Sequence, residues 1–184
     1  LDTHDQTTYR RTVRRVDDLA SIETAVQVEI SFDPSYESIS LHHIIVTLDG
    51  IPSDRLDMDQ FKIISVETDT AKLIFNGEKQ ASLILNDIRR GDIIDVAYSR
   101  SGMNPAFKGH ISLKRTLQFS APIAHYFFSV STPADIEFNI EQRHAGFDAV
   151  ISIDKGRKLH LWYLKNLKAI DPEDDEPYWS KTYP

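Results

Sequence analysis

The 184-residue sequence contains no cysteine. This excludes a cysteine nucleophile, a thiolate metal site and any disulfide within the chain. It does not identify the redox compartment, because a domain without cysteine survives in either environment. A domain of this length buries roughly 70% of its unfolded surface, so its core requires neither disulfides nor a metal ion.

Long apolar runs are also missing, since none approaches the roughly 18 residues of a membrane-spanning helix. The sequence begins at Leu1 without an initiator methionine or a signal peptide, and we interpret it as a mature or excised fragment. Its 21 Lys and Arg are outnumbered by 28 Asp and Glu, which gives a formal net charge of −7. This balance argues against general binding to nucleic acid or to an anionic membrane, because both favour a positive surface.

The sequence has no recognisable catalytic or metal-binding pattern. There is no Gly-x-Ser-x-Gly elbow, and no pair of carboxylates stands out among the many Asp and Glu. His42 and His43 are adjacent on an expected strand, where successive side chains point to opposite faces, so one metal ion could not easily bind both. No His-x-His or His-x-x-x-His spacing occurs. We therefore expect no metal site, no cofactor and no independent catalysis.

What the sequence does contain is a series of short strands. Apolar and polar residues alternate in runs that end in turn signals such as Asp49-Gly50, Asn76-Gly77 and Asp154-Lys155-Gly156. Turn signals at such regular spacing are typical of a β-sandwich or barrel. We predict an all-β fold, an antiparallel β-sandwich of about a dozen short strands with little helix, over residues 1–165.

The expected strands are residues 9–16, 21–32, 39–48, 61–66, 71–75, 80–85, 94–98, 110–119, 123–131, 135–142, 149–153 and 158–164. The first strand carries four arginines and is expected at a sheet edge, where charged side chains block pairing with another chain. Residues 53–60 are expected to hold at most one helical turn, with Ser53 as its N-cap.

The strand pattern is organised around a polar corner, Arg89-Arg90-Gly91-Asp92, between two strand-like runs. Gly91 permits a positive φ, and Asp92 can hydrogen-bond its own backbone. Arg90, Gly91 and Asp92 also spell an integrin-type tripeptide. A turn is the better interpretation, because strands are expected on both sides of it.

Three consecutive aromatic residues, Tyr126, Phe127 and Phe128, lie in the middle of an expected strand. Because successive side chains of a strand point to opposite faces, the three cannot all be buried on one face. At least one must face an opposite layer or a partner. A strand buried on both sides explains them at least as well as a ligand platform does.

The strand pattern ends near residue 165, and residues 166–184 are interpreted as an acidic and aromatic linker. Its carboxylates, within residues 171–176, lack the spacing and central glycine of a calcium loop. Tyr178, Trp179 and Tyr183 are expected to form an interdomain contact, because large aromatic residues are common anchors at contacts. The alternative is that this tail folds back over an open sheet edge of the same domain.

The sequence resembles the β-rich domain of unknown function that precedes transglutaminase-like domains in bacterial envelope proteins. The matching pieces, in the order of that family, are Tyr9-Arg10, residues 32–36, Leu41-His42, residues 48–50, residues 87–92, Tyr98, Gly102, Asn104, Pro105, Phe107, Gly109 and residues 177–179. The most specific part joins Arg90-Gly91-Asp92 to the loop that contains Gly102, Asn104 and Pro105, and these six residues are expected to be structural. A typical member has Arg at position 48, where this chain has Leu48.

The resemblance implies a β-sandwich followed by a papain-like catalytic domain with a Cys-His-Asp triad, which would lie beyond Pro184. It implies a periplasmic or cell-envelope location and a non-catalytic role, in which this domain docks to the transglutaminase-like domain or presents substrate to it. Two alternatives stay open: a stand-alone binding module for a cell-envelope polymer or peptide, and a cryptic hydrolase. A concave sheet face lined with aromatic residues would favour the binding module. An exposed apolar patch near Trp179 would favour docking. A pocket whose carboxylates or histidines have strongly perturbed pKa values would favour an enzyme.

Overall fold

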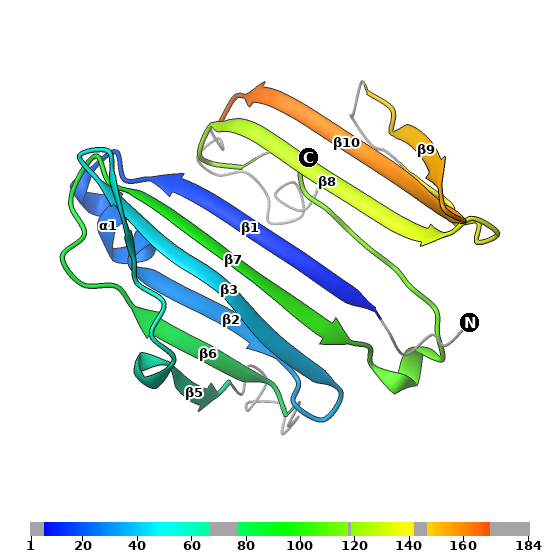
Figure 1. Cartoon of the computed structure of the whole chain (residues 1–184), viewed down its shortest axis with the longest axis horizontal. Helices are drawn as coiled ribbons and strands as arrows, with labels where there is room; N and C mark the ends of the chain where they lie inside the picture. The colour runs from blue at the N-terminus through cyan, green and yellow to red at the C-terminus, as the bar shows by residue number, and fades with distance from the viewer. Residues whose placement is uncertain (1–5, 67–76, 118, 142–146, 170–184) are drawn as a thin grey trace, which may run out of the picture. The chain divides into compact units, whose positions relative to one another are not determined.

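A computed structural model of the chain describes residues 6–66, 77–117, 119–141 and 147–169. These residues form ten strands in three antiparallel sheets, with one α-helix and short 3-10 turns (Figure 1). The all-β, antiparallel architecture predicted from the sequence is confirmed. The backbone divides into two compact units, residues 1–111 and residues 112–184, and each is described by itself.

Unit 1 contains two sheets. The four-stranded sheet has the order β1 (Thr7–Arg15), β7 (Ile93–Gly102), β3 (Glu37–Leu48) and β4 (Ile51–Asp54), and the three-stranded sheet has the order β2 (Gln27–Phe32), β6 (Lys79–Ile84) and β5 (Lys62–Ser65). Strand β1 lies at an edge of its sheet, as its basic sequence predicts.

Both sheets of unit 1 contribute to one core. The buried residues are Val16, Ala25, Val28, Ile44, Val46, Leu83, Leu85, Ile94 and Val96. Six of them occupy alternate positions of β2, β3, β6 and β7, which is why the period-two pattern of the sequence indicates a sandwich. Val16 and Leu85 directly follow β1 and β6, and Ala25 ends the helix α1 (Leu19–Ala25). Each fully buried aliphatic side chain, such as Ile44, stabilises the fold by roughly 1.5–3 kcal/mol relative to an exposed position.

A helix stands where the sequence predicts the start of a strand, so the prediction of a strand over residues 21–32 is wrong in its first half. The helix α1 spans Leu19–Ala25, and β2 begins at Gln27. The Asp18 carboxylate accepts a hydrogen bond from the Ser21 amide (2.7 Å), while the Ser21 hydroxyl receives one from the Asp18 amide (3.4 Å). This reciprocal capping box satisfies the amides of the first turn and starts a helix.

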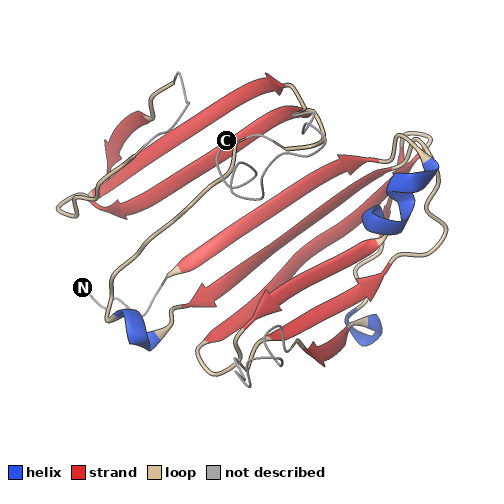
Figure 2. Cartoon of the chain, turned by 180° about the vertical axis from the view of Figure 1, so that it is seen from behind, coloured by secondary structure: helices blue, strands red, loops and turns tan. Residues whose placement is uncertain are grey.

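The remaining helical turns are short (Figure 2). They are η1 (Met58–Gln60) and η3 (Pro105–Phe107). The predicted cap of the first is wrong, because Ser53 lies within β4 and the carboxylate of Asp57 caps the turn. No helix among the described residues has the length and apolar character needed to cross a membrane.

Unit 2 is built on a three-stranded sheet in the order β8 (Ile123–Pro133), β10 (Arg157–Leu167) and β9 (Val150–Asp154). The hairpin between β9 and β10 turns at Lys155 and Gly156, which have φ angles of 47° and 75°. Two successive positive φ values match the twist of the flanking strands, so the predicted hairpin is confirmed.

Two further strands predicted in this part of the chain, over residues 110–119 and 135–142, are wrong: residues 110–117 and 136–141 contain none. One side chain of each segment contacts a ring of the sheet. The Arg115 guanidinium lies 5.2 Å from the centre of the Phe128 ring, and the Phe138 ring lies 4.6 Å from that of His160. Alternation of apolar and polar residues is therefore not sufficient to form a strand here. The strand expected over residues 71–75 lies outside the described residues.

Candidate functional site

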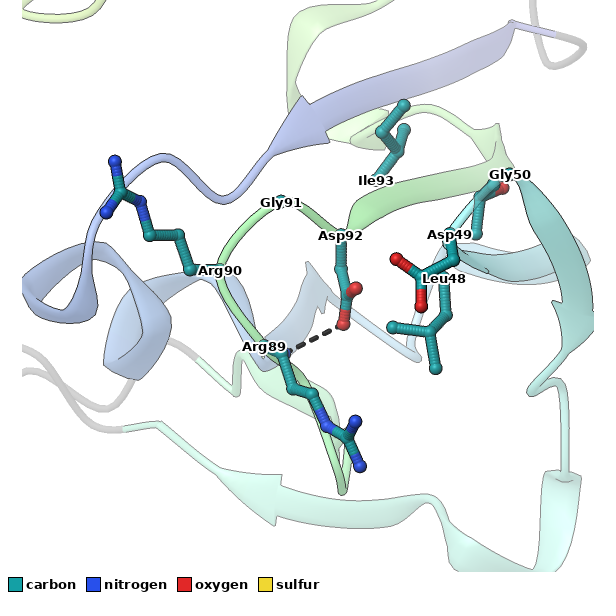
Figure 3. Close-up of a pocket in the computed structure, with 9 residues that line it drawn as sticks. Leu48, Asp49, Gly50, Arg89, Arg90, Gly91, Asp92 and Ile93 are labelled. Carbon is teal, nitrogen blue, oxygen red and sulfur yellow. Dashed lines mark hydrogen bonds between the residues drawn. The ribbon is translucent and has the colours of Figure 1, made fainter.

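The predicted polar corner is a tight turn whose side chains support the backbone (Figure 3). Gly91 has a φ of 96°, a conformation that glycine adopts without strain. The Asp92 carboxylate accepts a hydrogen bond from the Arg89 amide at 2.8 Å, and Asp92 is only 2% exposed. The tripeptide Arg90-Gly91-Asp92 thus forms a turn, and the carboxylate that an integrin-type partner would bind is buried within it.

Backbone hydrogen bonds also join the corner, which precedes β7, to Val16, the residue that follows β1. The Val16 amide donates to the Asp92 carbonyl (2.9 Å), and the Gly91 amide donates to the Val16 carbonyl (2.7 Å). Opposite the corner lies the turn at Asp49, and the two turns border a hollow of about 330 Å³ (Figure 3). Leu48 lines this hollow, so two pieces of the family signature that are distant in sequence meet there.

The loop after β7 is held by three of the other signature residues. Gly102 has a φ of 119°, and a β-carbon on it would lie 1.9 Å from the Tyr36 carbonyl oxygen. The Asn104 side chain accepts a hydrogen bond from the Ala106 amide at 2.9 Å and donates one to the Tyr36 hydroxyl at 3.4 Å. Pro105 occupies the first turn of η3, where its missing amide hydrogen is not needed.

Polar contacts fix the turn before β3 against this loop. The Asp33 carboxylate accepts hydrogen bonds from the hydroxyl (2.6 Å) and the amide (3.0 Å) of Ser35, and these bonds lower the pKa of Asp33. Glu37 accepts a hydrogen bond from the Asp33 amide (2.9 Å) and lies 3.4 Å from the Arg100 guanidinium. Burial, followed by the nearby Asp33 charge, raises the pKa of Tyr36. These groups are occupied in holding backbone segments together.

A β-bulge places two histidines on one face of the four-stranded sheet, so the prediction that they point to opposite faces is wrong. The register of β3 against β7 shifts between Leu41 and His43, which leaves His42 as the extra residue. His42 Nε2 then lies 2.8 Å from the Ser99 hydroxyl, and His43 Nε2 lies 2.9 Å from the Asp95 carboxylate. Asp95 and Ser99 are alternate residues of β7 and share a face.

These contacts belong to a polar strip, defined here as Tyr9, Arg11, His42, His43, Asp95 and Ser99. The Arg11 guanidinium donates two hydrogen bonds to Asp95, at 3.0 and 2.6 Å. Of the groups that lower the pKa of Asp95, Arg11 has the largest effect and His43 adds to it, while burial opposes both. The Tyr9 ring lies 5.6 Å from the His42 ring. Sequence reasoning missed this strip, because its members are far apart in the chain and depend on the bulge.

The polar strip contains one contact of the kind that hydrolases use. A hydroxyl hydrogen-bonded to a histidine, as Ser99 is to His42, is the first step of a nucleophile–base arrangement. The third member of such an arrangement orients the base, yet Asp95 contacts His43 and not His42. The described residues hold no group of three or more His, Cys, Asp and Glu that could bind a metal ion.

The consecutive aromatic residues of β8 divide between the faces of the unit 2 sheet. Phe128 lies 5.2 Å from Trp162, which is 8% exposed, on the face that also holds Tyr126. Phe127 lies on the opposite face and is 67% exposed, beside Tyr163, which is 48% exposed. The sequence predicted that at least one of the three consecutive aromatic residues faces another layer or a partner, but it did not indicate which one and contained no signal for Tyr163.

We call this exposed surface the aromatic patch, defined as His125, Phe127, Val150, Leu161, Tyr163 and Lys165. Strand pairing places all six on one face of β8, β9 and β10. His125 Nδ1 lies 2.8 Å from the Tyr163 hydroxyl, and the Lys165 ammonium lies 5.2 Å from the centre of the Tyr163 ring. The predicted interdomain residues, Tyr178, Trp179 and Tyr183, lie outside the described residues.

Comparison with known proteins identifies the family. The sequence profile of DUF3857, a domain of unknown function with a solved structure, matches residues 2–171. The chain belongs to the DUF3857 family. This is a β-rich domain of unknown function, as the sequence resemblance predicted. No curated protein matches the chain.

A solved structure shares the fold of this DUF3857 domain. It is a crystal structure from Parabacteroides distasonis ATCC 8503, described as a "putative protease", which aligns with a TM-score of 0.83 at 18% sequence identity. The alignment covers 96% of this chain and 35% of that chain. The DUF3857 domain thus spans about a third of the length of the protein it matches.

Proposed function

We propose that this DUF3857 domain is a non-catalytic accessory domain at the N-terminal side of a transglutaminase-like protein of papain-like fold. In that role it docks to the following catalytic domain or presents substrate to it. The alignment with the Parabacteroides protein carries the proposal: almost all of this chain corresponds to about a third of a protein described as a "putative protease". The remaining length of such a protein leaves room for a separate catalytic part.

The chemistry of the described residues supports an accessory role. The side chains of Asp92 and Asn104 complete local turns, and Gly102 is required by a close backbone approach. The chain has no cysteine, so a cysteine nucleophile would have to come from another part of the protein. Among the residues that the structure describes, no carboxylate is hydrogen-bonded to His42, the base of the Ser99–His42 pair.

The proposal includes the partner and the location. The partner is the transglutaminase-like domain of the same protein, and the location is the periplasm or cell envelope. The net charge of −7 supports a role without nucleic acid and without membrane contact by this domain. None of these roles requires a cofactor.

The test compares the longer natural protein with a version that lacks residues 1–169. Both would be assayed on a folded protein substrate and on a short peptide. If the domain presents substrate, its removal should lower kcat/KM on the protein substrate by about tenfold or more and leave the peptide unaffected, since remote binding then contributes to the transition state. If it only docks to the catalytic domain, both activities should fall together. Unchanged activity on both substrates would refute the accessory role.

One observation favours a second candidate, a binding module for an envelope polymer or peptide. The aromatic patch exposes Phe127 and Tyr163 side by side on a sheet face, and exposed aromatic rings are common in binding surfaces. The test is sedimentation of the chain with isolated cell-wall polymer. Binding that is lost on Tyr163→Ala would support the module, and absence of binding would exclude that polymer as its ligand.

A further inference from the structure

We propose that the aromatic patch is the surface through which this domain docks against the domain that follows it in the same protein. The inference rests on the proposed accessory function and names the surface that performs it. Its partner surface is apolar and carries a carboxylate that meets Lys165.

The first argument is the exposure of the patch. Phe127 is 67% exposed, Val150 68% and Tyr163 48%. Pairing of Phe127 with Tyr163, and of Val150 with Leu161, makes these side chains contiguous across three strands. Large, contiguous apolar side chains on a soluble domain mark an interaction surface more often than scattered ones do.

The second argument is that Tyr163 is held in place before any partner binds. Its hydroxyl contacts His125, its ring stacks on the His125 ring at 6.0 Å with an interplanar angle of 7°, and Lys165 lies over it. The Phe127 ring approaches from another side at 6.3 Å. A ring whose rotamer is already fixed loses little entropy on binding, which is the property of an interface anchor.

The third argument is the position of the patch along the chain. Tyr163 and Lys165 lie near the C-terminal end of β10, which ends at Leu167 and is the last strand that the structure describes. A domain that follows residues 166–184 is tethered to the strand that carries the patch, and a tether raises its effective concentration there. The similar Parabacteroides chain is much longer than this domain, so a further part of the same protein is the favoured occupant, and under the proposed function that part follows this domain.

The fourth argument is charge. The chain carries a net charge of −7, yet the patch contains no Asp or Glu, and two of its members, His125 and Lys165, have basic side chains. A cation beside exposed aromatic rings selects a surface with a carboxylate and apolar groups. By contrast, Arg11 and His43 of the polar strip already share Asp95, so that strip offers less unsatisfied charge to a partner.

Hydroxyl-radical footprinting tests the proposal, since it oxidises aromatic side chains in proportion to their exposure. The present chain and the longer natural protein would be labelled side by side. Labelling of Phe127 and Tyr163 should fall about fivefold in the longer protein, because exposed rings become part of an interface core. Phe107 and Ile153, which are 59% and 65% exposed and lie outside the patch, serve as controls and should not change.

A charge reversal within the longer protein provides the second measurement. Lys165→Glu should raise the labelling of Phe127 toward its level in the present chain, whereas Lys155→Glu, in the β9–β10 turn, should not. Far-UV circular dichroism would show that both variants are folded. If Lys165→Glu and Lys155→Glu change the labelling of Phe127 by the same amount, the proposed contact of Lys165 is contradicted.

The remaining outcomes separate this inference from the accessory function. Equal labelling of the patch in both proteins overturns the inference, and protection of a different surface would leave the accessory function standing. If Phe127 and Tyr163 are already protected from labelling in the present chain alone, the chain covers its own patch. If their protection in the present chain grows with protein concentration, a second copy covers the patch. If their protection requires added cell-wall polymer, the patch belongs to a binding module. Each of these three results also overturns the inference.

Discussion

At the scale of single residues, the family signature consists of groups that the backbone itself requires. Gly91 and Gly102 have positive φ angles, and Asp92 and Asn104 bond to amides close to them in the chain. The sequence predicted the turn at Gly91, because the signals of a turn are local. It could not predict that Gly102 approaches Tyr36, since that contact depends on the pairing of β3 with β7.

Gly102→Ala should strongly destabilise the domain. The new β-carbon would overlap the Tyr36 carbonyl oxygen, and the φ of 119° is strained for any residue with a side chain. We expect a loss of about 3 kcal/mol or more in the free energy of unfolding. Gly50→Ala is the matched control: its φ is 80° but nothing lies within 4 Å, so it should lose only about 1 kcal/mol. Urea unfolding measures both, and equal losses would show that the close approach is absent.

The Arg11–Asp95 contact predicts a pH dependence of stability. Arg11, with help from His43, holds the pKa of Asp95 below its ordinary value. A carboxyl group whose pKa is lowered in the folded state stabilises the fold above its unfolded pKa, and this stabilisation is lost as the pH falls through the folded value. Arg11→Gln should therefore lower the free energy of unfolding near neutral pH, by about 1 kcal/mol or less since Arg11 is exposed.

The measurement is urea unfolding of both proteins at about pH 6 and about pH 3, on either side of the ordinary pKa of Asp. The difference between wild type and Arg11→Gln should narrow at the lower pH. The matched control is Arg15→Gln, because Arg15 and its partner Asp17 are 67% and 63% exposed, so the substitution should give no measurable difference at either pH. If the difference in free energy of unfolding between wild type and Arg11→Gln widens as the pH falls, the assigned role of Asp95 is contradicted.

At the scale of elements, local pattern predicted strands well where they pair and failed where another contact competed. Residues 27–32 form the expected strand, but the capping box of Asp18 and Ser21 turns the preceding residues into α1. The bulge at His42 has no local signature, and it alone decides that both histidines share a face. Residues 110–117 alternate apolar and polar side chains but form no strand, because alternation alone does not supply a neighbouring strand to pair with.

The same substitution at two neighbouring residues of β8 should change the free energy of unfolding by very different amounts. Phe128 stacks on the buried Trp162, so Phe128→Ala should reduce the free energy of unfolding by about 2–4 kcal/mol. Phe127 is 67% exposed on the other face, so Phe127→Ala should stay within about 0.5 kcal/mol in the present chain. Urea unfolding followed by far-UV circular dichroism compares them. If Phe127→Ala proves as damaging as Phe128→Ala, the patch is part of a core and not a free surface.

At the scale of the whole molecule, the sequence predicted the class and the family but not the division of the chain. The all-β architecture follows from alternation, and the DUF3857 match follows from the signature residues. The boundary between the two units, near residue 111, lies within a stretch that reads as one more strand. Such a boundary is set by which contacts form over long range, and a pattern of short periods does not record them.

The last prediction concerns the role of the C-terminal residues. If Tyr178, Trp179 and Tyr183 contact a following domain, deleting residues 171–184 from the present chain should change its free energy of unfolding by less than about 1 kcal/mol. If the tail instead packs on this domain, loss of a buried Trp alone would lower it by several kcal/mol, about 3–5. Urea unfolding should be followed by far-UV circular dichroism, because the deletion removes Trp179 and would change the fluorescence by itself. A large drop in the unfolding midpoint would assign the tail to this domain, while an unchanged midpoint would leave its aromatic residues available to the same partner as the aromatic patch.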